Sequence, residues 1–302
     1  MKLADLAVDS LDRRLSGMGL VFQIGPFCIH LRSNLTDFAQ LMHRLYGEYP
    51  LVDDEQFADI HLYLYRPRTI RRWWRPQVQL RVDFQTPFEP FPKDTALPFL
   101  EWGLNWSIAT RAHQYLMIHA AVVEKYGKCI MMPALPGAGK STLSAALASR
   151  GWRLLSDEFA LIQPKTLAID PLPKLIPLKN ESIDIIRRFA PEAVIGPEFS
   201  KTRKGTVAHL RPPAASIIRA QEAGRGHWIV FAGFRSGAEP VLRPIAKERA
   251  LLRLSSNSFN YELIGLRGFE TAAGLIETCD CYLFEYGDLA QAIEQLEQLI
   301  GS

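Results

Sequence analysis

A glycine-rich segment between an apolar run and a run of small residues constrains the fold most strongly. Residues 134–142 read ALPGAGKST. The apolar pattern of residues 129–133 predicts a strand before it, and residues 140–150 predict a helix after it, which Gly151 ends. A strand, a glycine-rich turn and a helix in this order direct backbone N–H groups at an anion. The chain is therefore expected to be an α/β protein built around a phosphate-binding loop.

The residue types in this segment match the chemistry of a nucleotide-binding P-loop. That pattern is glycine, four residues and Gly-Lys-Ser/Thr, and here Ala134 takes the place of the first glycine. Gly137 and Gly139 let N–H groups approach phosphate oxygens, Lys140 supplies an ammonium near the β- and γ-phosphates, and the Ser141 hydroxyl suits Mg²⁺. The alternative is a glycine-bearing turn without a ligand. The residues expected to bind ATP are Pro136, Gly137, Ala138, Gly139, Lys140, Ser141 and Thr142.

Two carboxylates follow the next predicted strand, at residues 153–157. Carboxyl ends of neighbouring strands in a strand–loop–helix–strand unit face the same crevice, so Asp157 and Glu158 should approach the bound phosphates. One carboxylate could then accept the proton of an acceptor hydroxyl, while the other held Mg²⁺. The alternative is a solvated acidic turn.

His119 lies just before the strand hairpin that leads into the loop. Pairing Val123 with Lys128 across the turn at residues 125–127 puts His119 opposite Met132, beside the start of the loop. A histidine there could contact phosphates, or it could be a hydrogen-bonded core residue. The spacing leaves both interpretations open.

Composition excludes several other classes of protein. The 302 residues are 48% hydrophobic and 22% charged, with a net charge of +3, which is too small to indicate nucleic-acid binding. The four cysteines fit a reducing cytosol, and the pair in Cys279-Asp280-Cys281 has no second pair at zinc-site spacing. The N-terminus lacks a signal-peptide core and no apolar run is long enough to span a bilayer, so we expect a cytoplasmic protein without membrane contact.

The N-terminal region has a different pattern. Residues 19–91 mostly alternate between apolar and polar, as in residues 60–65 and 78–84, which predicts strands of an antiparallel sheet with one helix at 35–46. The proline-rich stretch 86–98 reads as a connector. We therefore expect an α+β domain at residues 1–95, suited to docking a substrate or partner, and an ATP-binding catalytic domain at residues 96–302.

Two basic segments lie outside the predicted core. In residues 66–75 arginines alternate with Trp73 and Trp74, which could bind RNA or an acidic peptide, or form a solvated tip with its tryptophans folded onto the sheet. Residues 201–211 could close over a transferring phosphoryl group, with Lys204 and Arg211 neutralising its charge, or form an ordinary surface loop.

Weaker signals follow further along the chain. Arg243 and the group Asn257, Asn260 and Tyr261 are candidates for approaching the same crevice.

The segment from His119 to Glu158 resembles the catalytic domain of HPr kinase/phosphorylases, which are related in fold to phosphoenolpyruvate carboxykinase. A closer resemblance, to the HPr-related kinase A family, covers nearly the whole chain. It rests on five strings: EWGLNW at 101–106, HAA at 119–121, PGAGKSTL at 136–143, GWRLLSDE at 151–158 and KGTVAHLRPP at 204–213.

The resemblance implies a mixed-sheet P-loop fold and a serine kinase. Asp157 takes the place of the catalytic aspartate, Glu158 stands where a second metal-binding aspartate is usual, and His119 matches a histidine near the phosphates. A peptide or small-protein acceptor, a small peptide-binding chaperone of the PqqD type as a partner, and assembly into homo-oligomers are also implied. The rival functions are a nucleotide hydrolase or small-molecule kinase, and a non-catalytic peptide-binding module regulated by ATP.

Overall fold

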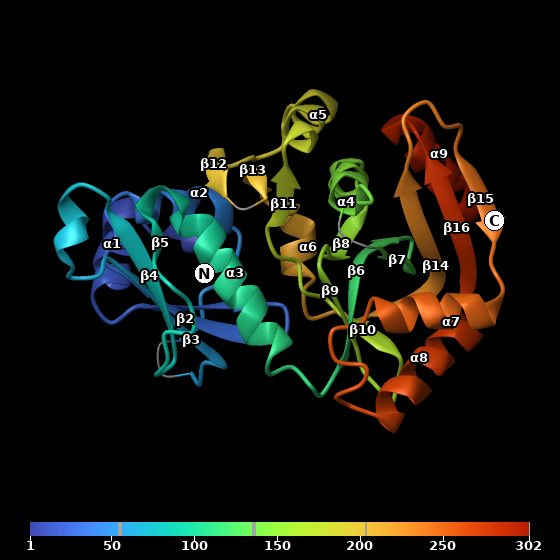
Figure 1. Ribbon diagram of the computed structural model, residues 1–302, viewed down its shortest axis with the longest axis horizontal. Helices are drawn as coiled ribbons and strands as arrows, with labels where there is room; N and C mark the ends of the chain where they lie inside the picture. Colours follow the sequence, from blue (N-terminus) through green and yellow to red (C-terminus); the bar gives the residue numbers. More distant parts are fainter. Residues whose placement is uncertain (54–55, 135–136, 203, 302) are drawn as a thin grey trace. The chain divides into compact units, whose positions relative to one another are not determined.

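The computed structural model describes residues 1–53, 56–134, 137–202 and 204–301 (Figure 1). The protein is a mixed α/β protein with several mixed and antiparallel sheets. Its contacts divide it into two compact units. The first unit comprises Met1–Arg111, Pro177–Ile183 and Val194–Arg211, and the second comprises Ala112–Ile176, Asp184–Ala193 and Pro212–Ser302. Among the described residues, no helix is both long and apolar enough to cross a membrane.

The first unit contains a five-stranded sheet with the strands in sequence order. Strands β2 and β3 are parallel, whereas the other neighbours are antiparallel. The prediction of an antiparallel sheet was therefore wrong for this pair, because the helix between them carries the chain back to the starting edge. The strands are β1 (Leu20–Ile24), β2 (Phe27–Ser33), β3 (Ile60–Tyr65), β4 (Gln77–Val82) and β5 (Phe91–Pro92), and the helix is α2 (Phe38–Tyr46).

Helix α3 (Ala96–Ala109) packs on this sheet against β3, β4 and β5. A side-chain carbon at Gly103 would lie 2.0 Å from Leu80 Cδ2, so glycine lets the helix approach β4 closely. The sequence places a domain boundary after residue 95, whereas these contacts keep α3 with the first unit. The remaining helices before it are η1 (Leu3–Asp5), α1 (Val8–Ser16), η2 (Ile70–Trp73) and η3 (Lys93–Thr95).

Two later segments of the chain also belong to the first unit. They contribute most of a three-stranded sheet in the order β11 (Ile176–Lys179), β13 (Gly205–Leu210) and β12 (Phe199–Thr202). Helix α5 (Glu181–Phe189) begins directly after β11 and is divided between the two units. Local packing within the first unit therefore includes residues distant in sequence.

The second unit is built on an eight-stranded mixed sheet in the order β10-β9-β6-β7-β14-β16-β15, with β8 paired to β6. Strands β7, β14 and β16 are mutually parallel neighbours, so their carboxyl ends meet at one edge. This edge carries the glycine-rich loop. The strands are β6 (Leu116–Lys125), β7 (Lys128–Pro133), β8 (Arg153–Ser156), β9 (Phe159–Ile162), β10 (Ala168–Asp170), β14 (Gly224–Phe234), β15 (Val241–Pro244) and β16 (Asp280–Tyr286).

Helices pack on this sheet and build the core of the second unit. Alternate residues of β6 lie in one buried cluster with apolar side chains of α7 (Lys247–Ser256) and α8 (Leu266–Thr278). Helix α4 (Lys140–Ser149) packs on β6 and on α9 (Leu289–Gly301), and α6 (Ala214–Ile218) packs on β8. The buried sheet therefore provides a firm base for the loop between β7 and α4.

Candidate functional site

The hairpin before the loop sets where His119 lies. Tyr126 and Gly127 have φ angles of 55° and 77°, the conformation of a tight two-residue hairpin turn, so Lys125 pairs with Lys128. The predicted pairing of Val123 with Lys128 was wrong, because the turn holds two residues rather than four. His119 consequently lies one residue beyond the last pair with β7 and pairs with Phe159 of β9.

The loop itself depends on two glycines in the left-handed region. Gly137 and Gly139 have φ angles of 93° and 84°. Gly139 is the N-cap of α4 and supplies no side-chain cap, so the helix presents its first N–H groups without a capping oxygen. A side-chain carbon at Gly137 would meet nothing within 4 Å. The positive φ values, the open space at Gly137 and the uncapped helix start are features that favour an anion site, while the predicted residue Pro136 lies outside the described residues.

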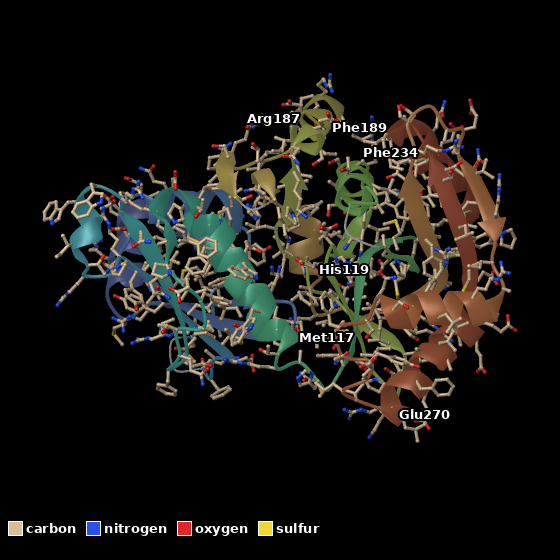
Figure 2. The ribbon with its side chains drawn as sticks, viewed as in Figure 1. Met117, His119, Arg187, Phe189, Phe234 and Glu270 are labelled. Carbon is tan, nitrogen blue, oxygen red and sulfur yellow. The ribbon has the colours of Figure 1, made fainter. Side chains whose placement is uncertain are left out.

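Residues at the ends of β14 and β16 contact the loop. The Phe234 amide donates to the Ala138 carbonyl oxygen at 3.3 Å, and the Tyr286 hydroxyl donates to the Gly139 carbonyl oxygen at 3.4 Å. A side-chain carbon at Gly139 would lie 3.0 Å from both Phe234 Cβ and Tyr286 Oη. Phe234 is labelled in Figure 2. Neither aromatic residue was predicted, because only the strand order brings them to the loop.

Asp157 joins the start of α4 to the end of β8. Its Oδ2 accepts a hydrogen bond from Ser141 Oγ at 2.8 Å and its Oδ1 accepts one from Ser144 Oγ at 2.5 Å. The Lys140 ammonium donates to the Asp157 carbonyl oxygen at 2.7 Å. Asp157 and Lys140 are only 5% and 7% exposed. The structure thus brings together three predicted residues and adds Ser144, three positions after Ser141 on the helix.

Burial raises the pKa of Asp157 above its ordinary value. The charge of Lys140 and the hydroxyls of Ser144 and Ser141 act in the opposite direction, and the nearby charge of Glu158 adds to the rise. A carboxylate with a raised pKa is a better proton acceptor near neutral pH. The surroundings of Asp157 therefore suit a general base.

The predicted metal ligands lie close to this carboxylate. Ser141 directs its hydroxyl at Asp157, and Glu158 is half-buried, with its amide donating to Ser156 Oγ at 3.3 Å. Within the described ranges no three His, Cys, Asp or Glu side chains are grouped so as to hold a metal ion alone. A divalent cation here would need oxygen ligands from a bound phosphate. Thr142, the last predicted loop residue, is half-buried in the first turn of α4.

His119 packs within an aromatic group at the end of the β6–β9 pair. Its amide donates to the Asn257 carbonyl oxygen at 2.6 Å, and its ring meets the Phe259 ring edge-on at 5.6 Å. Phe259 also contacts Phe159, which follows Glu158 directly, at 4.7 Å between centroids. Figure 2 labels His119 together with Met117 of the same strand. His119 is therefore linked, through its strand pairing and through Phe259, to Phe159, the residue that follows Glu158.

The other candidates have different environments. Lys204 and Arg211 belong to the first unit, whereas the loop belongs to the second. Lys204 is exposed, and Arg211 donates to the Arg44 carbonyl oxygen at 3.3 Å. Arg243 is exposed on β15. Asn260 is buried, where its side chain bonds the Met117 amide and the Tyr115 carbonyl, which is a structural role.

The arginine-rich connection between β3 and β4 leaves its two tryptophans exposed. Trp73 and Trp74 are 76% and 64% exposed. The prediction that these tryptophans fold onto the sheet was therefore wrong. The short η2 helix within this connection carries the chain away from the sheet without burying them.

All four cysteines are free and buried, as expected from their number and spacing. Burial raises the pKa of Cys129 to about 12 and that of Cys279 to about 11. These thiols are protonated at neutral pH and are poor metal ligands or nucleophiles.

No known protein family matches the chain, and no curated protein matches it significantly. The support for a function therefore comes from the chemistry of the loop and of Asp157.

Proposed function

We propose that this protein is an ATP-dependent kinase of the HPr kinase-like type, related to the HPr-related kinase A family, which transfers the γ-phosphoryl group to a serine hydroxyl of a peptide or small protein. The observation that carries the proposal is the buried Asp157 carboxylate, bonded to Ser141 at the start of the helix that follows the loop. A phosphate-binding loop and an acceptor-activating carboxylate must be this close for direct transfer.

The loop fits the polyphosphate of ATP. Gly137 leaves open space that a phosphate oxygen could fill, Gly139 has the same left-handed backbone conformation, and the uncapped start of α4 adds partial positive charge. Lys140 is held by the Asp157 carbonyl at the same place. Its ammonium would neutralise charge on the β- and γ-phosphates as the bond between them breaks.

Ser141 and Glu158 fit Mg²⁺ as a pair of oxygen ligands that leaves positions for phosphate oxygens. When bound, the ion supplies charge neutralisation across the β- and γ-phosphates. The hydroxyl of Ser141 can serve as a ligand because its oxygen keeps a lone pair while its proton is donated to Asp157.

Asp157 would take the proton from the acceptor hydroxyl. The hydroxyl oxygen then bonds to the γ-phosphorus, the bond from that phosphorus to the β–γ bridging oxygen breaks, and ADP leaves with the electron pair. Ser141 and Ser144 hold the two carboxylate oxygens, which fixes the direction of the remaining lone pairs. His119, whose strand partner Phe159 follows Glu158, is proposed to contact the phosphates.

The test is to supply γ-labelled ATP and Mg²⁺ with a serine peptide and to compare the wild type with Asp157→Asn. We expect the variant to keep ATP binding and to lose transfer about a thousandfold. Labelled phosphate released only to water would indicate the nucleotide hydrolase instead. ATP binding without either product, unchanged in the variant, would indicate the regulated binding module.

A further inference from the structure

The face of the five-stranded sheet opposite its buried face carries arginines stacked on tyrosines. The guanidinium carbons of Arg32 and Arg81 each lie 5.2 Å from the Tyr63 ring centroid, and Tyr63 stacks on Tyr65 at 4.9 Å. The residues that alternate with the tyrosines along β3 are buried, so both rings project from the other face. This face is therefore polar, aromatic and positively charged.

The same strand leads into the connection at residues 66–75 (cyan in Figure 1), which has the same character. It contains five arginines, and no acidic residue occurs between Tyr65 and Asp83. Besides the two tryptophans, Ile70 is 78% exposed. Trp and Arg are the residue types that dominate binding energy at interfaces. Arg32, Tyr63, Tyr65, Arg81 and the side chains of residues 66–70 and 73–75 are together called the arginine–aromatic surface.

Three arginines of the connection, Arg66, Arg68 and Arg75, carry exposed charges. Among the residues that the structure describes, no acidic side chain pairs with Arg66, Arg68 or Arg75. Two acidic residues that flank the neighbouring strands have partners elsewhere, since Asp83 pairs with Arg111 and Asp59 accepts a hydrogen bond from the Cys28 amide. The surface is thus complementary to a negatively charged partner.

We propose that the arginine–aromatic surface docks an acidic peptide segment of the phosphoryl acceptor, in which apolar side chains alternate with carboxylates. The carboxylates would meet the arginines, and the apolar side chains would cover Ile70 and the tryptophans. This inference rests on the proposed function for the identity of the partner as an acceptor. The docking itself depends only on the charge and exposure of the first unit.

The sheet part of this surface fits a peptide better than a single-stranded nucleic acid. Bases bind by stacking on open aromatic faces. The Tyr63 ring is already covered by Arg32 and Arg81, and it stacks on Tyr65. What the sheet presents is guanidinium groups, which match carboxylates in geometry.

The experiment measures the fluorescence anisotropy of a labelled peptide of alternating Glu and Leu added to the full chain. The variant is Arg66→Ala/Arg68→Ala/Arg75→Ala, and its matched control is Arg188→Ala/Arg225→Ala/Arg249→Ala, which removes three exposed arginines of the second unit. A Gln/Leu peptide and an oligothymidine are run as competing probes. ATP binding is measured on the same samples.

We expect the Glu/Leu peptide to bind, with a Kd about tenfold higher for the Arg66 triple variant and unchanged for the control, and with weaker binding at high salt. Equal loss in both triple variants, equal binding of the Gln/Leu peptide, or no binding would overturn the proposal. Preferential binding of the oligothymidine would also overturn it in favour of a nucleic acid. Peptide binding without any ATP binding would refute the kinase and leave the docking surface intact.

Discussion

The loop with Asp157 and the arginine–aromatic surface place their charged side chains in different environments. At the loop, Lys140 and Asp157 are buried and each polar oxygen of Asp157 has a partner within the second unit. On the arginine–aromatic surface, Arg66, Arg68, Arg75 and Arg81 are exposed. Burial fixes the orientation of the side-chain groups and shifts their pKa values, which suits a reaction at one defined atom. Exposed side chains can reorient, and each ion pair that they form contributes little free energy. Such side chains suit the recognition of peptides that differ in sequence.

The largest effect on ATP binding is expected from Lys140→Ala. The change removes the ammonium from the phosphate loop and leaves the Asp157 carbonyl without this donor. ATP binding should weaken about a hundredfold, since charge-assisted hydrogen bonds to phosphate are strong, and calorimetry with ATP and Mg²⁺ measures it. Exposed Lys165→Ala is the control. A variant with unchanged affinity would show that the lysine does not face the nucleotide.

The position of the glycine-rich loop and its proximity to Asp157 could be predicted from the sequence because their signals are local. A strand, two glycines and a helix fix the loop, and a second strand ends at Asp157. The residues that contact the loop, Phe234 and Tyr286, could not be predicted. They lie beside Gly139 only because of the order of β7, β14 and β16 in the sheet. The predicted pairing of the hairpin strands was wrong for a related reason. Tyr126 adopts a positive φ, which is uncommon for a residue other than glycine and which the sequence does not indicate.

The N-terminal sheet shows the limits of periodicity. Alternating residues predicted strands near 60–65 and 78–84 but could not give their directions, and β2 and β3 proved parallel. Helix α3 looked like part of the second domain because a proline-rich stretch precedes it. Its packing on β4 depends on the small volume of Gly103, which is visible only once Leu80 lies opposite.

The next effect compares two glycines that share a backbone conformation. Gly139→Ala should lower the free energy of unfolding by about 2 kcal/mol, because it combines strain at positive φ with contact against Phe234 and Tyr286. Gly137→Ala meets nothing within 4 Å and should lower it by about 1 kcal/mol from strain alone. Urea denaturation of both variants measures the difference. Equal losses would mean that β14 and β16 do not support the loop.

A smaller effect should appear in the pH dependence of Asp157→Asn. Because the folded-state pKa of Asp157 is raised, its protonated form is favoured by folding. The stability it contributes is full below the unfolded pKa and is lost as pH rises through the folded pKa. The Asn variant should therefore gain stability relative to the wild type as pH rises toward neutrality, and the difference should vanish in acid. Denaturation curves across this pH range check the sign, and a wild type that is the more stable at neutral pH would contradict it.

The smallest effect is expected at the arginine–aromatic surface. Arg66→Ala/Arg68→Ala/Arg75→Ala removes exposed charges without ion-pair partners among the described residues, so the free energy of unfolding should change by less than about 0.5 kcal/mol. Relief of repulsion between like charges would make the change, if any, stabilising. Urea denaturation of this variant and of Lys140→Ala under the same conditions compares their free energies of unfolding. A loss as large as that of a buried residue would show that these arginines hold the first unit together, and the contrast between a fixed site and an adjustable surface would fail.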